Sequence, residues 1–135
     1  MNLILDSNVI VSAFSSRGLC SSIFELCLDR YTIIISKFIL SEVYKTLYNK
    51  YKMPQNNVDM IVEYLTEFCM VKDYEKFGKR VCRDKDDDEI LALGESSKAK
   101  YIITGDKDLL ILKKFHSIKI LTPREFWEVV RKVEK

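Results

Sequence analysis

Four acidic residues stand where the chemistry of a metal site would need them. Asp6 and Asp106 each follow a short apolar run, Glu42 lies early in a helical pattern, and Asp88 belongs to an acidic cluster, residues 86–89, that opens another helical pattern. In parallel sheets, ligands bind beyond the carboxyl ends of the strands. We therefore expect these side chains to converge at one edge of a sheet.

Carboxylates gathered in this way need a counter-ion. Two unit charges about 4 Å apart repel each other by roughly 4 kcal/mol at an effective dielectric constant of 20. Mg²⁺ or Mn²⁺ fits best, because these hard cations prefer carboxylate oxygens and retain bound water. Such ions activate water for phosphodiester hydrolysis. The chain has one histidine, His116, and no cysteine spacing typical of zinc ligands. The sequence therefore favours magnesium or manganese over zinc.

Three polar neighbours are expected to orient this site. Ser7 and Asn8 follow Asp6 directly, and Thr104 lies two residues before Asp106. Their side chains can hydrogen-bond a ligating carboxylate or a bound water. The simpler interpretation of Ser7 and Asn8 is turn formation.

Each acid also has a structural interpretation when it is taken alone. Asp6 can cap the end of a strand, and Glu42 can face solvent on its helix. Asp86 and Glu89 have the spacing of a capping box at a helix start, where the helix dipole favours acids. Only the combination of all the acids at strand ends favours a metal site.

The elements that must position these acids alternate along the chain. Short β-branched runs are separated by amphipathic helical segments, which predicts an α/β fold with a mainly parallel sheet of about five strands. The expected strands are 2–6, 31–35, 69–72, 101–104 and 118–121. The expected helices start near residues 9, 21, 36, 54, 86, 106 and 123.

Length and composition narrow the class of protein. A chain of 135 residues with 47% hydrophobic residues predicts a single domain, 1–135, with a substantial core. No apolar run reaches the roughly 18 to 20 residues of a membrane span, and Asp6 interrupts the first apolar run, which argues against a signal peptide. The four cysteines are interpreted as free thiols, so we expect a cytoplasmic protein without a membrane partner.

The charge distribution points to a polyanionic substrate. The net charge is only +2, from 22 basic and 20 acidic residues. Eight of the acids belong to the candidate site and its flanks, which leaves 12 acids against 22 basic residues elsewhere. A basic surface around an acidic pit suits a nucleic acid cut with the help of metal ions.

Other functions fit the residues less well. Ser12, Ser15 and Ser16 lack a histidine partner for a Ser-His-Asp hydrolase. The run after the first strand lacks the second acid of a D-x-D phosphatase, and no lysine follows the last strand as a receiver domain requires. A phosphoryl-transfer protein on a similar fold and a non-catalytic RNA- or partner-binding module remain the alternatives.

Four motifs carry a resemblance to a known family. They are Leu5-Asp6-Ser7-Asn8-Val9, Ser41-Glu42, the run from Arg83 to Leu93, and the run from Ile103 to Leu109. The ordered set with this spacing is specific. Over essentially its whole length the chain resembles PIN-domain ribonucleases, and in particular the VapC-like toxins of prokaryotic toxin–antitoxin modules.

The resemblance implies a three-layer α/β/α sandwich and a Mg²⁺- or Mn²⁺-dependent endoribonuclease. It assigns Asp6, Glu42, Asp88 and Asp106 as the catalytic metal ligands, with Asp108 assisting. Asp88 is chosen for its distance from Ile90-Leu91-Ala92, with Asp86 and Asp87 as alternatives. The resemblance also implies a homodimer and an antitoxin partner that enters the acidic groove.

Five basic residues flank the acids in sequence and are interpreted as contacts for RNA phosphates. They are Arg17, Lys37, Arg83, Lys85 and Lys107.

Overall fold

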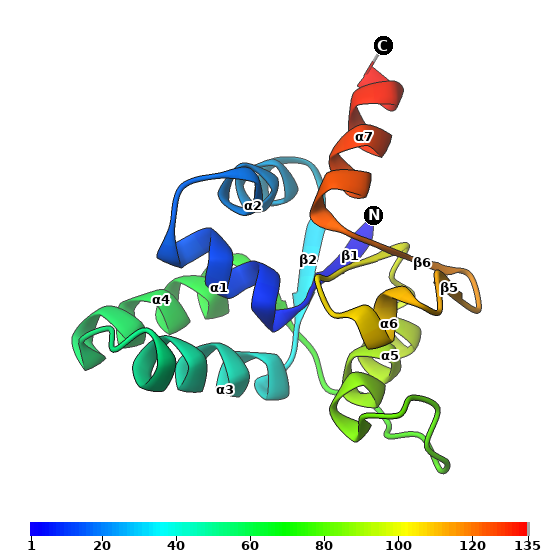
Figure 1. Cartoon of the computed structure of the whole chain (residues 1–135), viewed down its shortest axis with the longest axis horizontal. Helices are drawn as coiled ribbons and strands as arrows, with labels where there is room; N and C mark the ends of the chain where they lie inside the picture. Colours follow the sequence, from blue (N-terminus) through cyan, green and yellow to red (C-terminus); the bar gives the residue numbers. More distant parts are fainter. Residues whose placement is uncertain (135) are drawn as a thin grey trace.

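The computed structural model describes residues 1–134 and contains a mixed sheet surrounded by helices (Figure 1). Its strands are β1 (Asn2–Leu5), β2 (Thr32–Ile35), β3 (Met70–Val71), β4 (Tyr101–Ile103), β5 (Lys114–Phe115) and β6 (Ile118–Leu121). Its α-helices are α1 (Ser7–Ser15), α2 (Leu19–Arg30), α3 (Lys37–Lys45), α4 (Gln55–Phe68), α5 (Lys85–Ser97), α6 (Lys107–Leu110) and α7 (Pro123–Glu134). A π-helical turn, η1 (Thr46–Lys50), continues α3.

The sheet order places the carboxyl end of β1 at the centre of the molecule. The order is β3-β2-β1-β4-β6-β5, and every pair is parallel except β5 with β6. The chain moves outward from β1 through β2 to β3 and then returns to the other side of β1 with β4. This reversal makes a topological switch point between β1 and β4, where open α/β sheets bind their ligands.

The five expected strands are confirmed, and a sixth was missed. The helix expected to start near residue 106 is α6, but it ends at Leu110 and the chain then turns into the edge strand β5. The β5–β6 hairpin closes through His116, whose φ is 54°. A positive φ suits the tight turn of a hairpin, and a two-residue strand such as β5 is too short to leave a clear alternating pattern.

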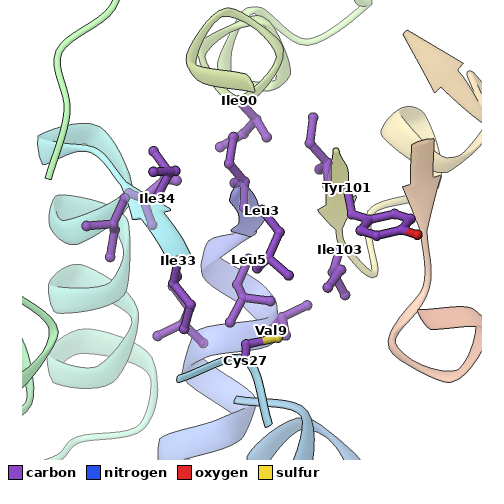
Figure 2. Packing of buried hydrophobic residues seen from close by; sticks show 14 of the residues in the cluster. Leu3, Leu5, Val9, Cys27, Ile33, Ile34, Ile90, Tyr101 and Ile103 are labelled. Atoms are coloured by element: carbon purple, nitrogen blue, oxygen red, sulfur yellow. The ribbon is translucent and has the colours of Figure 1, made fainter. Parts of the chain in front are cut away.

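Helices cover both faces of the sheet, which confirms the α/β/α sandwich. Figure 2 shows Ile90 of α5 on one side of β1 and the side chains of Val9 in α1 and Cys27 in α2 on the other. Because both faces are covered, Leu3 and Leu5 on one side of β1 and Ile4 on the other are all fully buried. Such a continuous apolar run is typical of a central parallel strand.

Most helix starts follow from local capping chemistry. The α1 helix begins at Ser7, two residues earlier than expected, because Asp6 accepts a hydrogen bond from the Ser7 backbone N–H. Ser36 caps α3 through Ile39, as expected. The α5 helix begins at Lys85 with Asp84 as its cap, so the expected capping box of Asp86 and Glu89 was wrong.

Within the described residues, no one helix combines the length and apolar composition needed to cross a membrane. The helices α1 and α2 meet that test only as a pair bent by 108°.

Close packing of α5 on the sheet depends on Gly94. A Cβ atom at this position would lie 3.0 Å from Ile118 Cδ1 and 3.2 Å from Ile102 Cδ1. We expect Gly94→Leu to lower the free energy of unfolding by about 2 kcal/mol, because a larger side chain overpacks this contact. Ser96→Leu, at an exposed position of the same helix, is the control and should have little effect. Urea denaturation of both variants measures the difference, and equal midpoints would contradict this account of the packing.

Candidate metal-binding active site

Asp6 is the buried centre of the site. It directly follows β1, and only 5% of its surface is accessible to solvent. Its Oδ1 accepts a hydrogen bond from the Ser7 N–H at 2.7 Å, and its Oδ2 accepts from Thr104 Oγ1 at 2.7 Å and Asn8 Nδ2 at 3.2 Å. Burial raises the pKa of Asp6, the hydrogen bonds oppose the increase, and the nearby charge of Asp106 adds to it. The carboxylate is thus held rigidly in one orientation.

Thr104 and Asn8 connect the ends of β1 and β4. The fully buried Thr104 hydroxyl donates to Asp6 and accepts a hydrogen bond from the Asp106 N–H at 2.9 Å. Asn8 donates to Asp6 and accepts from the Gly105 N–H at 3.0 Å. The structure therefore brings Asn8 and Thr104, both expected to orient the site, into contact with Asp6.

Glu42 reaches the same site from α3. Its Oε1 accepts a hydrogen bond from Ser7 Oγ at 3.2 Å. Partial burial raises the pKa of Glu42. The charge of Asp6 adds to the increase, and the charge of Asp86 adds a smaller amount. The simpler interpretation of Glu42 as an acid that only faces solvent does not describe this environment.

Asp87 is the acid that α5 contributes to the centre. Asp87 is buried, with 5% of its surface accessible to solvent, and its Oδ2 has no hydrogen-bond partner. Burial, the adjacent Asp106 carboxyl, and the charges of Asp84 and Asp6 raise the pKa of Asp87 to about 7. A buried carboxylate oxygen without a donor is costly for the folded protein unless a proton or a cation accompanies it.

Asp106 and Asp108 complete the cluster on the other side. Asp106 caps α6 through the Asp108 N–H at 2.9 Å. One carboxylate oxygen from each of Asp87, Asp106 and Asp108 lies within 4.8 Å of the others. Arg83 lies beside them, with Nη2 3.1 and 3.2 Å from the two oxygens of Asp108.

These side chains surround a polar cavity of about 110 Å³ at the switch point. It is lined by Asp6, Ser7, Asn8, Glu42, Asp84, Asp86, Asp87, Ile90 and Asp106. The expected convergence of strand-end and helix-start acids is therefore seen for Asp6, Glu42 and Asp106. Asp84 is an additional acid that the sequence reasoning did not select.

Asp88 lies outside this cavity. Its Oδ2 accepts a hydrogen bond from the Val81 N–H at 2.9 Å, and its Oδ1 accepts from the Cys82 N–H at 2.7 Å. Of these two neighbouring acids, Asp87 therefore lines the acidic cavity and Asp88 does not.

Helical spacing in the sequence does not separate Asp87 from Asp88, because Ile90, Leu91 and Ala92 are all buried; the difference is seen only in the structure. Asp87, Ile90, Gly94 and Ser97 are buried and follow one another at intervals of three or four residues, as one face of a helix does. Asp88 is one position away and points toward the preceding loop.

The donor set fits a divalent cation. It consists of carboxylate oxygens, one of them buried without a partner, and Mg²⁺ and Mn²⁺ prefer such oxygen ligands. Asp6, Glu42, Asp87 and Asp106, with Asp108 at the rim, are the residues that can hold an ion here.

Comparison with known proteins gives a consistent result. The family model described as PIN domain matches residues 2–108. No match is found among curated proteins.

Solved structures with a similar fold include proteins from three bacteria. VapBC2 from Rickettsia felis, bound to a DNA fragment from its promoter, has a TM-score of 0.62 at 15% identity and covers 89% of this chain and 97% of that one. Mycobacterium tuberculosis VapC20, described as a sarcin-ricin loop cleaving toxin, has a TM-score of 0.58 at 9% identity, covering 87% and 98%. FitAcB from Neisseria gonorrhoeae has a TM-score of 0.58 at 14% identity, covering 90% and 98%. Since the matched segment includes most of the chain and all the strand-end acids, the protein belongs to the PIN-domain family.

Proposed function

We propose that this protein is a Mg²⁺- or Mn²⁺-dependent endoribonuclease. The observation that carries the proposal is the buried, unpartnered Asp87 Oδ2 beside Asp106 and Asp108, in a cavity that also contains Asp6 and Glu42. So many carboxylates without a lysine or arginine among the cavity residues favour a cation as their common partner. The basic surface elsewhere supports a polyanionic substrate.

The residues of the site have distinct roles in this proposal. Asp6, Glu42, Asp87 and Asp106 hold the ion, with Asp108 assisting at the rim. When bound, the ion supplies water activation and stabilisation of the leaving oxygen in phosphodiester hydrolysis.

Thr104 and Asn8 fix the orientation of Asp6, and the Ser7 hydroxyl fixes Glu42. Neighbours of this kind that hold metal ligands in place are worth about 10- to 100-fold in metal affinity or activity.

We further propose that the chain is the toxin of a toxin–antitoxin pair that acts on RNA in the cytoplasm. The likeness of the fold to VapC20, described as a toxin that cleaves the sarcin-ricin loop, supports this proposal. The expected homodimer and antitoxin partner are part of it and stay predictions.

Loss of the Asp6 carboxylate should abolish cleavage. We expect Asp6→Asn to reduce Mn²⁺-dependent cleavage of a fluorescent single-stranded RNA by at least about 100-fold, because a ligand should cost more than its supporting neighbours. Asp29→Asn, an exposed acid of α2, is the matched control and should cleave at the parent rate. Full activity of Asp6→Asn would refute the mechanism. Activity that persists in EDTA would refute the metal dependence.

Asp87 and Asp88 can be distinguished by metal binding alone. We expect Mn²⁺ to raise the thermal midpoint of the parent and of Asp88→Asn by similar amounts, because Asp88 lies outside the acidic cavity and bonds to the loop at Val81 and Cys82. The shift should be lost or strongly reduced in Asp87→Asn, since a bound ligand stabilises only the state that binds it. The opposite ranking of the two variants would restore Asp88 as the ligand.

The stability of the metal-free protein should fall as pH rises. Asp87 has a pKa of about 7 when folded and an ordinary value of 3.8. Between these values the folded state binds more protons than the unfolded state. Ionisation of the buried Asp87 carboxyl therefore destabilises the folded state; this effect is absent below the lower pKa and complete above the higher one. We expect a lower thermal midpoint at about pH 8 than at about pH 5.5, with a smaller difference in Asp87→Asn.

Added Mn²⁺ should stabilise the protein more at the higher pH, because metal ligands must be deprotonated. Thermal scans at both pH values, with and without Mn²⁺, measure the pH dependence of the metal-free protein and the pH dependence of its stabilisation by Mn²⁺. A pH dependence that is identical in parent and Asp87→Asn would exclude Asp87 as its source.

A further inference from the structure

We propose that residues 76–85, here called the basic loop, bind a backbone phosphate of the RNA substrate beside the acidic cavity, and that Asp88 positions the loop. This inference rests on the proposed ribonuclease function and names the part of the chain that holds its substrate. The loop carries Lys76, Lys79, Arg80, Arg83 and Lys85 against one acid, Asp84.

The loop forms one wall of a second cavity, of about 300 Å³. The residues that line it are Lys76, Phe77, Gly78, Lys79, Arg80, Lys85, Asp88 and Glu89. Four of these eight side chains are cationic, whereas the neighbouring cavity at the switch point is lined by acids.

Both acids of the second cavity already have partners. Glu89 accepts a hydrogen bond from the Tyr74 hydroxyl and pairs with Lys76 at 3.5 Å. Asp88 accepts the two backbone N–H groups of Val81 and Cys82.

The remaining cations of the cavity are free to meet a ligand. Among the described residues, Lys79, Arg80 and Lys85 form no ion pair. The cavity therefore presents uncompensated positive charge, which an anion would match.

The loop is fixed at three points rather than loosely attached. Asp88 holds the backbone at Val81 and Cys82, and the Phe77 ring packs against Phe115 with centroids 5.7 Å apart. Arg83 is joined to Asp108 at the rim of the acidic cluster. A loop held in this way can present its cations in a defined position, which lowers the entropic cost of binding.

The first turn of α5 separates the two cavities. Asp86 and Asp87 line the acidic cavity, whereas Lys85, Asp88 and Glu89 line the basic one. A phosphodiester drawn to the metal site would be repelled by unneutralised carboxylates. Cations in the second cavity can hold a neighbouring phosphate of the same strand and so keep the substrate in place. Because an RNA strand carries a charge at every nucleotide, a single strand offers a phosphate to each of the two cavities.

The test measures RNA binding separately from cleavage. In the Asp6→Asn background, the dissociation constant for a fluorescent single-stranded RNA is measured by anisotropy at several salt concentrations. We expect Lys79→Ala with Arg80→Ala to weaken binding about tenfold and to reduce the slope of log K against log salt by about 0.7, the value for one phosphate contact on a single strand. The control, Lys100→Ala with Lys119→Ala, removes two exposed lysines at the amino ends of β4 and β6 and should leave both values unchanged.

The positioning role of Asp88 is tested by kinetics in the otherwise unmodified protein. We expect Asp88→Ala to raise KM by more than it lowers kcat, because both loop N–H groups lose their acceptor. Asp88→Asn keeps one acceptor oxygen and should give an intermediate KM. A fall in kcat without a change in KM would overturn the positioning role.

The outcomes separate this inference from the proposed function. Parent-like RNA binding and salt slope in the loop variant would overturn the inference even if the protein cleaves RNA. Weakened binding in the loop variant, together with no cleavage by the parent under any metal, would support the inference and refute the nuclease. If RNA binding is unchanged but binding of a polyglutamate peptide is lost, the loop is a protein-binding surface and the inference is wrong.

Discussion

Repulsion among carboxylates buried at the carboxyl edge of the sheet is the constraint on which the rest of the structure depends. Asp6 and Asp87 each retain 5% of their exposure, and the pKa of each is raised chiefly by burial. Such a site forms only if the surrounding fold is stable enough to hold it. The fully buried strand β1 and the close contact of α5 at Gly94 provide that rigid frame.

The hydrogen bonds of the site separate the acids that line the cavity from Asp88, which holds the preceding loop. Thr104 and Asn8 satisfy Asp6, so that its carboxylate is oriented and only partly compensated. Asp87 Oδ2 has no donor at all. Two backbone N–H groups satisfy Asp88, which therefore shapes the loop before α5. Adjacent acids on one helix thus do different work because successive side chains point in different directions.

Charge is arranged in space as the proposed chemistry requires. The first turn of α5 separates the acidic cavity from the cavity that the basic loop lines. Arg83 bridges them through Asp108, which limits the net negative charge that an incoming polyanion would meet. The basic loop also contains most of the longest connection without regular structure in the described chain, residues 72–84 between β3 and α5. Such long loops are commonly functional.

The sequence alone determined the α/β class and five of the strands, because these depend on periodicity and capping residues, which are local patterns. It also determined the convergence of Asp6, Glu42 and Asp106, because the carboxyl ends of parallel strands meet at one edge of the sheet. Only the tertiary structure shows that Asp87, and not Asp88, lines the acidic cavity, since this depends on where α5 begins and which face it turns to the sheet. The hydrogen bond from Thr104 to Asp6 spans 98 positions in sequence, and no local pattern encodes such a contact. The edge strand β5 likewise depends on tertiary structure, because its two residues form a strand only by pairing with β6.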